Sequence, residues 1–294
     1  MTALLLGALG LTLSLVVPGP LAGARWPERA PAAAVLAWQS ITLTGVLCAL
    51  GVVLSGPEEL VRALGSGRPV AAVALIGTLA VAAVIVIRLL LALIGVSRRS
   101  RARRDRHRTL ADLLDRAERH ERIDVEGLRV LDSALPLAYC VPGRSPRVVL
   151  SEGALQMLDE PQVEAVIRHE QAHLRHHDDV VMESFTAFYE AVPRPLRSRA
   201  PLDAVHLLLE MVADDAARRR CGPAPLRAAL ERLSDAVQGS AADRRRRLDR
   251  LGPAGHLSTP LSVLVGVVSV CLVVLPTVIL VVPWLDRAFA AWPF

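Results

Sequence analysis

The stretch "RHEQAHLRHHDD", residues 168–179, places four histidines and three carboxylates within twelve positions of a chain that is otherwise rich in apolar residues. The chain has 294 residues, of which 52% are hydrophobic, and a formal net charge of +5. Its mean hydropathy of +0.40 excludes both an ordinary soluble domain and a disordered chain. The composition therefore indicates a membrane protein with a polar insert around this histidine-rich stretch.

Four stretches are long and apolar enough to cross a bilayer core of roughly 30 Å, which needs about 20 helical residues. They are residues 3–22, 33–54, 70–95 and 261–283. The first resembles a signal peptide in having "AGA" at 22–24, but no basic residues precede its apolar run. We expect it to be retained as a span, with cleavage as the alternative.

Arginine clusters border the polar insert on both sides. "SRRSRARRDRHR", 97–108, has seven arginines after the third span, and "RRRRLDR", 244–250, has five before the fourth. Because positively charged flanks stay in the cytoplasm, the insert is predicted to be cytoplasmic and both termini external, in a multi-pass protein of the cell membrane. Residues 55–69 carry balanced charges and are expected to form an external loop.

The composition also limits the partners. Aromatic residues make up only 3% of the chain, which leaves few platforms for stacking nucleic-acid bases, so no direct nucleic-acid partner is expected. Topology and contact with anionic lipids account for the arginine clusters. None of the four cysteines forms a CxxC pair, which argues against a zinc site made of thiolates.

The expected fold is an α-helical membrane protein with four transmembrane helices and an inserted cytoplasmic α+β domain. Its expected parts are residues 1–97, 98–258 and 259–294. In the insert, "LRVLDS", "LAYCV" and "RVVLS" predict two or three strands. A helix is predicted to start at Asp159, with Gln162 three residues on, and another to end at Gly222.

The histidine-rich stretch contains the pattern HExxH. His169 and His173 are four residues apart, so on a helix they project from one face and can both reach one zinc ion. Glu170 then lies where it can take a proton from water beside the metal. The same five residues also arise by chance on solvated helix faces, so the motif requires a third ligand to support a catalytic metal site.

Two residues are candidates for that ligand. Asp179 has the spacing of the metzincin class, but His176 stands where that class needs a glycine and no suitable methionine turn follows. Glu210 lies 37 residues past His173 in "EMVAD". Asp214 is one helical turn beyond it and can reach a ligand histidine to fix its tautomer. This pairing favours Glu210.

HExxH followed by ExxxD on a separate helix resembles the gluzincins. The run 138–178 is similar to membrane zinc peptidases of the BlaR/MecR antirepressor type, and less closely to the CAAX-protease and heat-shock membrane protease group. Three spans before the domain and one after it also resemble the antirepressor type. The resemblance implies Zn²⁺ as cofactor, His169, His173 and Glu210 as its ligands, Glu170 as general base and acid, and Asp214 as the partner of a ligand histidine.

The implied function is a membrane-embedded zinc metalloendopeptidase that cleaves a cytoplasmic protein, such as a transcriptional repressor in a signalling pathway. By analogy with zincins, "LAYCV" is the edge strand that receives the peptide. His206, four residues before Glu210, and Arg247, which resembles an arginine near the end of the family's domain, are candidate transition-state stabilisers. A structural role for His206 is an alternative, and Cys140 is interpreted as a small apolar filler.

Two other functions stay open. One is a non-enzymatic membrane receptor or scaffold that keeps a structural metal, and the other is a quality-control protease for membrane proteins. Glu170 favours an enzyme, because a purely structural site has no use for a base beside the water. Beta-lactam sensing is not expected, since only about eleven residues follow the last span.

Overall fold

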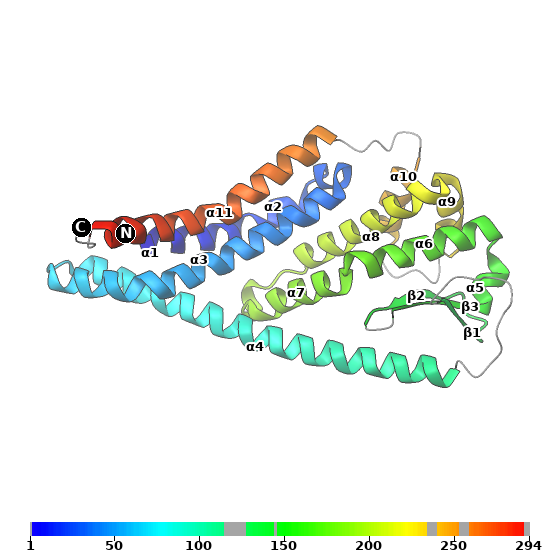
Figure 1. Cartoon of the computed structure of the whole chain (residues 1–294), viewed down its shortest axis with the longest axis horizontal. Coiled ribbons are helices and arrows are strands. Elements are labelled where there is room, and N and C mark those ends of the chain that lie inside the picture. Colours follow the sequence, from blue (N-terminus) through cyan, green and yellow to red (C-terminus); the bar gives the residue numbers. More distant parts are fainter. Residues whose placement is uncertain (1, 115–127, 144–145, 234–239, 253–258, 291–294) are drawn as a thin grey trace. The chain divides into compact units, whose positions relative to one another are not determined.

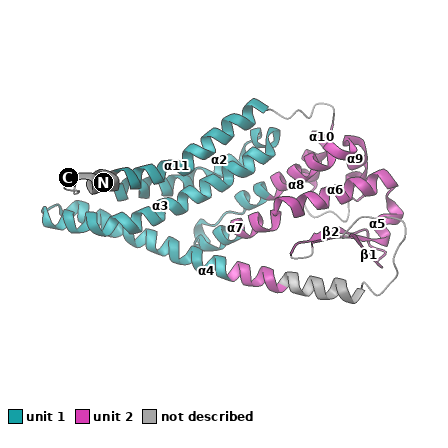
Figure 2. Cartoon of the chain, in the orientation of Figure 1, with its two compact units in different colours: residues 1–94, 186–205, 258–294 teal, residues 95–185, 206–257 magenta. Residues whose placement is uncertain are grey.

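The computed structural model describes residues 2–114, 128–143, 146–233, 240–252 and 259–290, most of which are helical. The chain divides into two compact units (Figure 2). The first comprises residues 1–94, 186–205 and 258–294, and the second comprises residues 95–185 and 206–257. The boundaries expected for the insert, 98 and 258, stay a prediction.

The first unit contains the long apolar helices (Figure 1). In chain order its elements are α1 (Thr2–Leu11), the π-helical turn η1 (Thr12–Val16), α2 (Pro18–Gly23), the 3₁₀ turn η2 (Trp26–Arg29), α3 (Pro31–Gly65), the first part of α4 (Pro69–Leu114), and α11 (Thr259–Ala290). The end of α7 (Asp178–Ala191), the 3₁₀ turn η3 (Arg194–Leu196) and the start of α8 (Ala200–Cys221) also belong to it.

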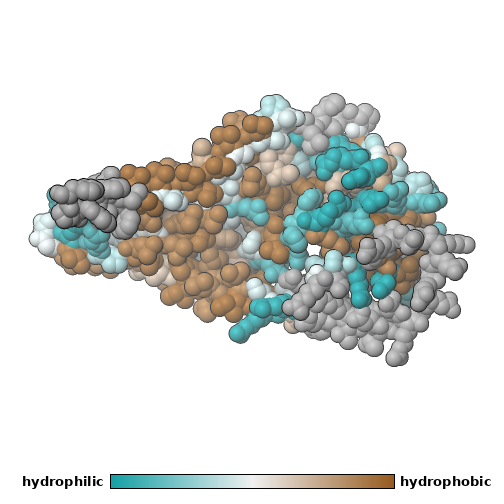
Figure 3. Space-filling model, in the orientation of Figure 1, coloured by the Kyte–Doolittle hydropathy of each residue, from teal (hydrophilic) through white to brown (hydrophobic). Residues whose placement is uncertain are grey.

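Four helical segments in the described residues are long and apolar enough to cross a membrane. They are Thr2–Gly23, Pro31–Gly65, Pro69–Ala102 and Thr259–Val282, and each contains all or nearly all of one expected span. Hydrophobic residues dominate the visible surface of these helices (Figure 3), and many of their leucines, valines and isoleucines are exposed. Long apolar helices compatible with membrane spans are therefore confirmed, whereas the orientation of the chain stays a prediction.

Small residues and one buried hydroxyl bring these helices together. A Cβ atom added at Gly10 in α1 would lie 2.9 Å from the Cβ of Cys48 in α3, so the two backbones approach closely. The hydroxyl of Thr44 in α3 is fully buried and donates to the carbonyl of Leu272 in α11 at 2.9 Å. Close packing and interhelical hydrogen bonds thus hold these helices together, as they do in lipid, where the hydrophobic effect does not drive helix association.

The prediction of a loop at 55–69 is wrong for most of these residues, whereas their external position stays a prediction. α3 continues to Gly65, and only three residues separate it from α4. Glu58 pairs with Arg62 one turn later at 3.1 Å, while Glu59 is buried and accepts a hydrogen bond from the backbone N–H of Thr2 at 2.8 Å. The charged residues of this segment therefore stabilise helices. Glu58 pairs along α3, and Glu59 caps the start of α1.

The second unit begins with a three-stranded sheet, which confirms the expected strands. β1 (Leu128–Leu131) pairs in parallel with β3 (Arg147–Ser151), and β2 (Ala138–Val141) pairs antiparallel with β3 on its other side. Because the order is β1-β3-β2, β2 is an edge strand of the described sheet. The helices of this unit are the end of α4, α5 (Glu152–Met157), α6 (Glu160–His176), the first part of α7, the main part of α8, α9 (Pro223–Arg232) and α10 (Ala241–Arg250).

The core of this unit lies between the sheet, α6 and α9. Its buried residues include Leu150, Val166, Ile167 and Ala229. α6 starts as expected, with Asp159 accepting from the backbone N–H of Gln162 at 3.1 Å in a capping box. α8 ends at Gly222, whose φ of 81° suits a residue without a side chain. These two well-terminated helices carry the polar residues of the site.

Candidate metal centre

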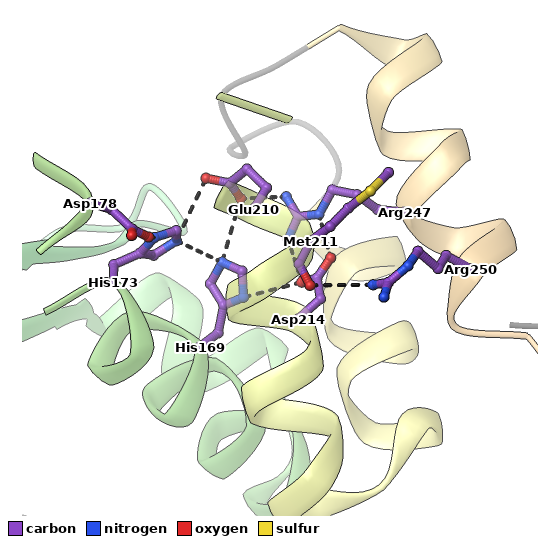
Figure 4. A network of polar contacts seen from close by, with 8 residues as sticks. All are labelled: His169, His173, Asp178, Glu210, Met211, Asp214, Arg247 and Arg250. Carbon is purple, nitrogen blue, oxygen red and sulfur yellow. Dashed lines mark hydrogen bonds and ion pairs between the residues drawn. The ribbon is translucent and has the colours of Figure 1, made fainter. Parts of the chain in front are cut away.

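α6 presents its two motif histidines from one face. His169 and His173 lie one turn apart, and their Nε2 atoms are 3.1 Å apart (Figure 4). Their rings meet edge to face, with centroids 4.8 Å apart. The His169 side chain is 10% exposed and that of His173 15% exposed, so both imidazoles are largely withdrawn from water. Two nitrogen lone pairs can therefore be offered to one point in space.

Glu210 of α8 brings a carboxylate to the same point. Its Oε2 lies 3.4 Å from Nε2 of His169, and its Oε1 lies 3.6 Å from Nε2 of His173. The ligand atoms of these three residues all lie within 4.8 Å of one another. The structure thus brings together the three residues selected from the sequence, and Asp179, the rejected candidate, is not part of this group.

The other ring nitrogen of each histidine faces a second carboxylate. Nδ1 of His173 lies 2.6 Å from Oδ2 of Asp178, within hydrogen-bond distance. Nδ1 of His169 lies 3.1 Å from Oδ1 of Asp214, an ion-pair distance whose angle falls short of a hydrogen bond. Carboxylates in these positions fix the tautomer that leaves Nε2 free to bind a metal, and they make the imidazole a stronger ligand.

Asp178 was not selected as a site residue from the sequence. It directly follows His177, which closes α6 in the left-handed conformation with φ 53°. The sequence signal was weak, because it consisted only of an acid five residues after His173. Only the reversal of the chain at His177 makes that spacing meaningful.

Arg247 of α10 holds both acids of α8. Its Nε and Nη2 donate to the two oxygens of Asp214 at 2.8 and 2.7 Å, and its Nη1 donates to Oε2 of Glu210 at 2.7 Å. The guanidinium is 5% exposed. Its donors are thus directed at protein carboxylates, which makes Arg247 a positioning residue here. A role in stabilising the transition state stays a prediction.

A second pair attaches α10 to α8 beside the first. Arg250 donates to Oδ2 of Asp215 at 2.6 Å and to the backbone carbonyl of Met211 at 3.3 Å. Arg218 of α8 approaches the other oxygen of Asp215 at 3.3 Å. α10 therefore docks on the acidic face of α8 through Arg247 and Arg250, which are three residues apart on the same face of α10.

The electrostatics of the cluster favour bound positive charge. Burial opposes the charged form of His169, but the carboxylates of Asp214 and Glu210 outweigh it and raise the pKa of His169 to about 10. Burial likewise opposes ionisation of Glu210, yet the neighbouring His169 and Arg247 hold its pKa well below its usual range. Burial opposes ionisation of Asp214 too, while the charge of Arg247 lowers its pKa. The carboxylates thus remain ionised and stabilise a cation among them.

Cys140 of β2 lies near Glu170 of α6. Ala138 packs on the core that contains Val166 of α6, and Cys140, two residues on, points from the same face of β2. Glu170 is half-buried, and its carboxylate lies close enough to Cys140 for its charge to act on the thiol. Burial, followed by the charge of Glu170, raises the pKa of Cys140 well above its usual range. The interpretation of Cys140 as a small apolar filler agrees with its burial, and its nearness to the expected base is an additional feature.

The remaining histidines lie outside the network drawn in Figure 4. His206 is half-buried on α8, one turn before Glu210, and its proposed roles stay predictions. His176 and His177 are exposed at the end of α6, as expected of a solvated face.

One comparison with known protein families gave a match. Residues 97–194 match the family model for peptidase family M48. The match supports an M48 metallopeptidase domain. It includes the sheet and the HExxH helix, and it ends before Glu210. Neither the curated proteins nor the solved structures gave a match.

M48 peptidases are metal-dependent and typically use zinc, which agrees with the donor set of His169, His173 and Glu210. A metallopeptidase is therefore the activity that both the M48 match and the geometry support. The match does not extend to the antirepressor type.

Proposed function

We propose that the protein is a membrane-embedded zinc metalloendopeptidase whose metal is held by His169, His173 and Glu210. The observation that carries the proposal is the convergence of these three ligand atoms within 4.8 Å from two separate helices. A His₂Glu set is typical of catalytic zinc, because it leaves a coordination position open. The carboxylates behind both histidines support the same assignment.

The donor set fits a divalent cation on charge as well as on geometry. Asp178, Glu210 and Asp214 contribute three carboxylates to the network in Figure 4, where Arg247 pairs with two of them; the second guanidinium drawn, that of Arg250, pairs with Asp215. Three carboxylates against one guanidinium leave negative charge at a site that is mostly withdrawn from water. Buried charge of this kind is costly unless it is compensated, and a doubly charged ion offsets it.

Glu170 is the residue proposed to move protons. When bound, zinc would acidify a water molecule and polarise the scissile carbonyl. Glu170 follows a ligand on the same helix, so its carboxylate can accept the proton released by the attacking water and pass it to the leaving amine.

Presentation of the substrate is assigned to β2. This strand is an edge of the described sheet, and its Cys140 lies within the electrostatic reach of Glu170, so the edge is near the expected base. An extended peptide can add to such an edge through main-chain hydrogen bonds, which favours cleavage within a chain in an extended conformation.

The location of the domain and the identity of its substrate are inferred from the sequence. A cytoplasmic domain is supported by the arginine clusters beside the spans, and a transcriptional repressor as substrate is supported only by the resemblance to the antirepressor type. Quality-control proteolysis is the alternative substrate choice, and a non-enzymatic scaffold with a structural metal is the alternative class.

The decisive test compares bound zinc and peptide cleavage in the purified full chain and in Glu170→Gln. Glu164→Gln is the matched control, because it makes the same change on an exposed position of the same helix. We expect about one zinc per chain in all three proteins. Cleavage of a peptide library should fall by roughly 10²–10⁴-fold in Glu170→Gln alone, the range for loss of a general base.

Equal cleavage by the wild type and Glu170→Gln would remove Glu170 from its assigned role. Zinc in every protein with cleavage in none, across the library, would favour the scaffold.

A further inference from the structure

The connection between α7 and α8 is a basic element within the unit of apolar helices. We define this α7–α8 connection as residues 189–199, which contain three arginines in "YEAVPRPLRSR". It belongs to the same compact unit as the apolar part of α4. We propose that the α7–α8 connection lies in the headgroup layer of the bilayer and binds anionic phospholipids. The inference is independent of the proposed peptidase activity.

A hydrogen bond fixes the level of this connection along the apolar helix. Nε of Arg88 in α4 donates to the backbone carbonyl of Ala191 at 2.6 Å. Around Arg88, α4 exposes apolar side chains such as Ile87, which is 56% exposed, and Leu91, which is 65% exposed. Ala191 therefore lies beside a part of α4 whose surface suits lipid rather than water.

The length of α4 places Arg88 near the edge of the hydrocarbon core. The apolar stretch begins at Pro69, directly after Arg68, and the 20 residues from Pro69 to Arg88 span about 30 Å of helix. This length equals the roughly 30 Å thickness of a bilayer core. The apolar stretch continues past Arg88 to Val96, about 12 Å of helix, so Arg88 lies in its last part, where a long charged side chain can extend to the headgroups.

The backbone at this level is satisfied by arginines of the protein. The last carbonyls of a helix have no partner within the helix, and lipid supplies none. Arg88 takes the carbonyl of Ala191, while Arg197 donates to the carbonyls of Glu190 and Val192 at 2.8 and 3.0 Å. Arg197 also lies over the ring of Tyr189, 4.9 Å from its centroid. A helix end closed in this way suits a boundary with little free water.

The outer surface of the connection combines charge with an apolar tip. Arg194 and Arg199 are exposed, and Leu196 between them is 62% exposed. Guanidinium groups bind phosphate oxygens in a bidentate manner, and a leucine at the same height can enter the acyl boundary. The continuity with the exposed apolar surface of α4 favours a bilayer over a soluble phosphate compound as the partner.

The test is the accessibility of a cysteine at the tip. Leu196→Cys in the full chain is treated with a membrane-impermeant maleimide in detergent, in phosphatidylcholine bilayers, and in bilayers that also contain phosphatidylglycerol. The parent chain gives the background from native cysteines, and Glu164→Cys, at an exposed position of α6, is the control. We expect labelling at position 196 to be roughly tenfold slower with phosphatidylglycerol than in detergent. This rate corresponds to a connection that is inserted in the bilayer in about nine molecules in ten.

Charge reversal separates lipid recognition from simple burial. Arg194→Glu with Arg199→Glu should restore fast labelling in the phosphatidylglycerol bilayers, and the two lysine substitutions should keep it slow. Unchanged thermal unfolding in these variants shows that they are folded. Labelling as fast in bilayers as in detergent, protection that ignores phosphatidylglycerol, or equal slowing at position 164 would each overturn the proposal.

Discussion

Arg247 offers the sharpest test of how the site is held together. Its guanidinium is 5% exposed and makes three short hydrogen bonds to Asp214 and Glu210. Arg247→Ala removes the only guanidinium of the drawn network that contacts these two acids, and it leaves the buried Asp214 and the half-buried Glu210 without that partner. Breaking a buried ion pair by removing one partner costs about 3–5 kcal/mol, because the remaining charge is uncompensated.

The size of the effect should depend on the metal. In zinc-free protein, a loss of about 3–5 kcal/mol corresponds to a fall in Tm on the order of 10 °C for a unit of this size. With zinc bound, coordination neutralises the charge of Glu210, so the loss should be smaller. Thermal unfolding followed by circular dichroism, with and without a chelator, measures both values. Arg245→Ala is the matched control, since it removes an exposed arginine from the same helix.

Two results would refute this reasoning. One is an Arg247→Ala protein no less stable than Arg245→Ala when zinc is absent. The other is an equal loss with and without zinc, which would mean that Glu210 does not share its charge between Arg247 and a metal.

The other predictions concern the metal itself. Glu210→Ala should release zinc, measured by elemental analysis after dialysis, whereas Asp179→Ala should retain it; the reverse result would favour the metzincin arrangement. Asp178→Asn should weaken zinc binding by roughly 10–100-fold in a competition assay with a chelating dye, because His173 loses the carboxylate that orients it; unchanged affinity would show that this contact is dispensable. Removal of zinc with a chelator should lower the Tm of the wild type, since an ion that binds only the folded state stabilises it; an unchanged Tm would count against a bound metal.

Local sequence signals were sufficient for the elements that carry the site. The capping box at Asp159 predicted where α6 begins, and Gly222 predicted where α8 ends, because these features act within a few residues. HExxH selected His169 and His173 for the same reason. Glu210 needed more, since 37 residues separate it from His173 and only the ExxxD pattern pointed to it.

Features that depend on distant partners were beyond the sequence. The helical nature of residues 55–65 was missed because the partner of Glu59 is the backbone of Thr2, 57 residues away. Alignment within "RRRRLDR" was ambiguous because four consecutive arginines look alike in sequence. Burial distinguishes them, since Arg247 is buried against α8 while Arg245 and Arg246 are exposed.

The contacts of α10 link the metal centre to the chain that follows it. Glu210 is a proposed ligand, and Arg247, which donates to it, lies on the helix that precedes the apolar α11 in sequence. Any change that moves α10 away from α8 therefore removes the Arg247 guanidinium, which pairs with Glu210 and Asp214, while the three ligand residues stay on α6 and α8. Loss of that charge leaves the carboxylates more dependent on the metal, so the protein without zinc should respond to displacement of α10 more strongly than the protein with zinc. The order of stabilities expected for Arg247→Ala follows from the same physical cause.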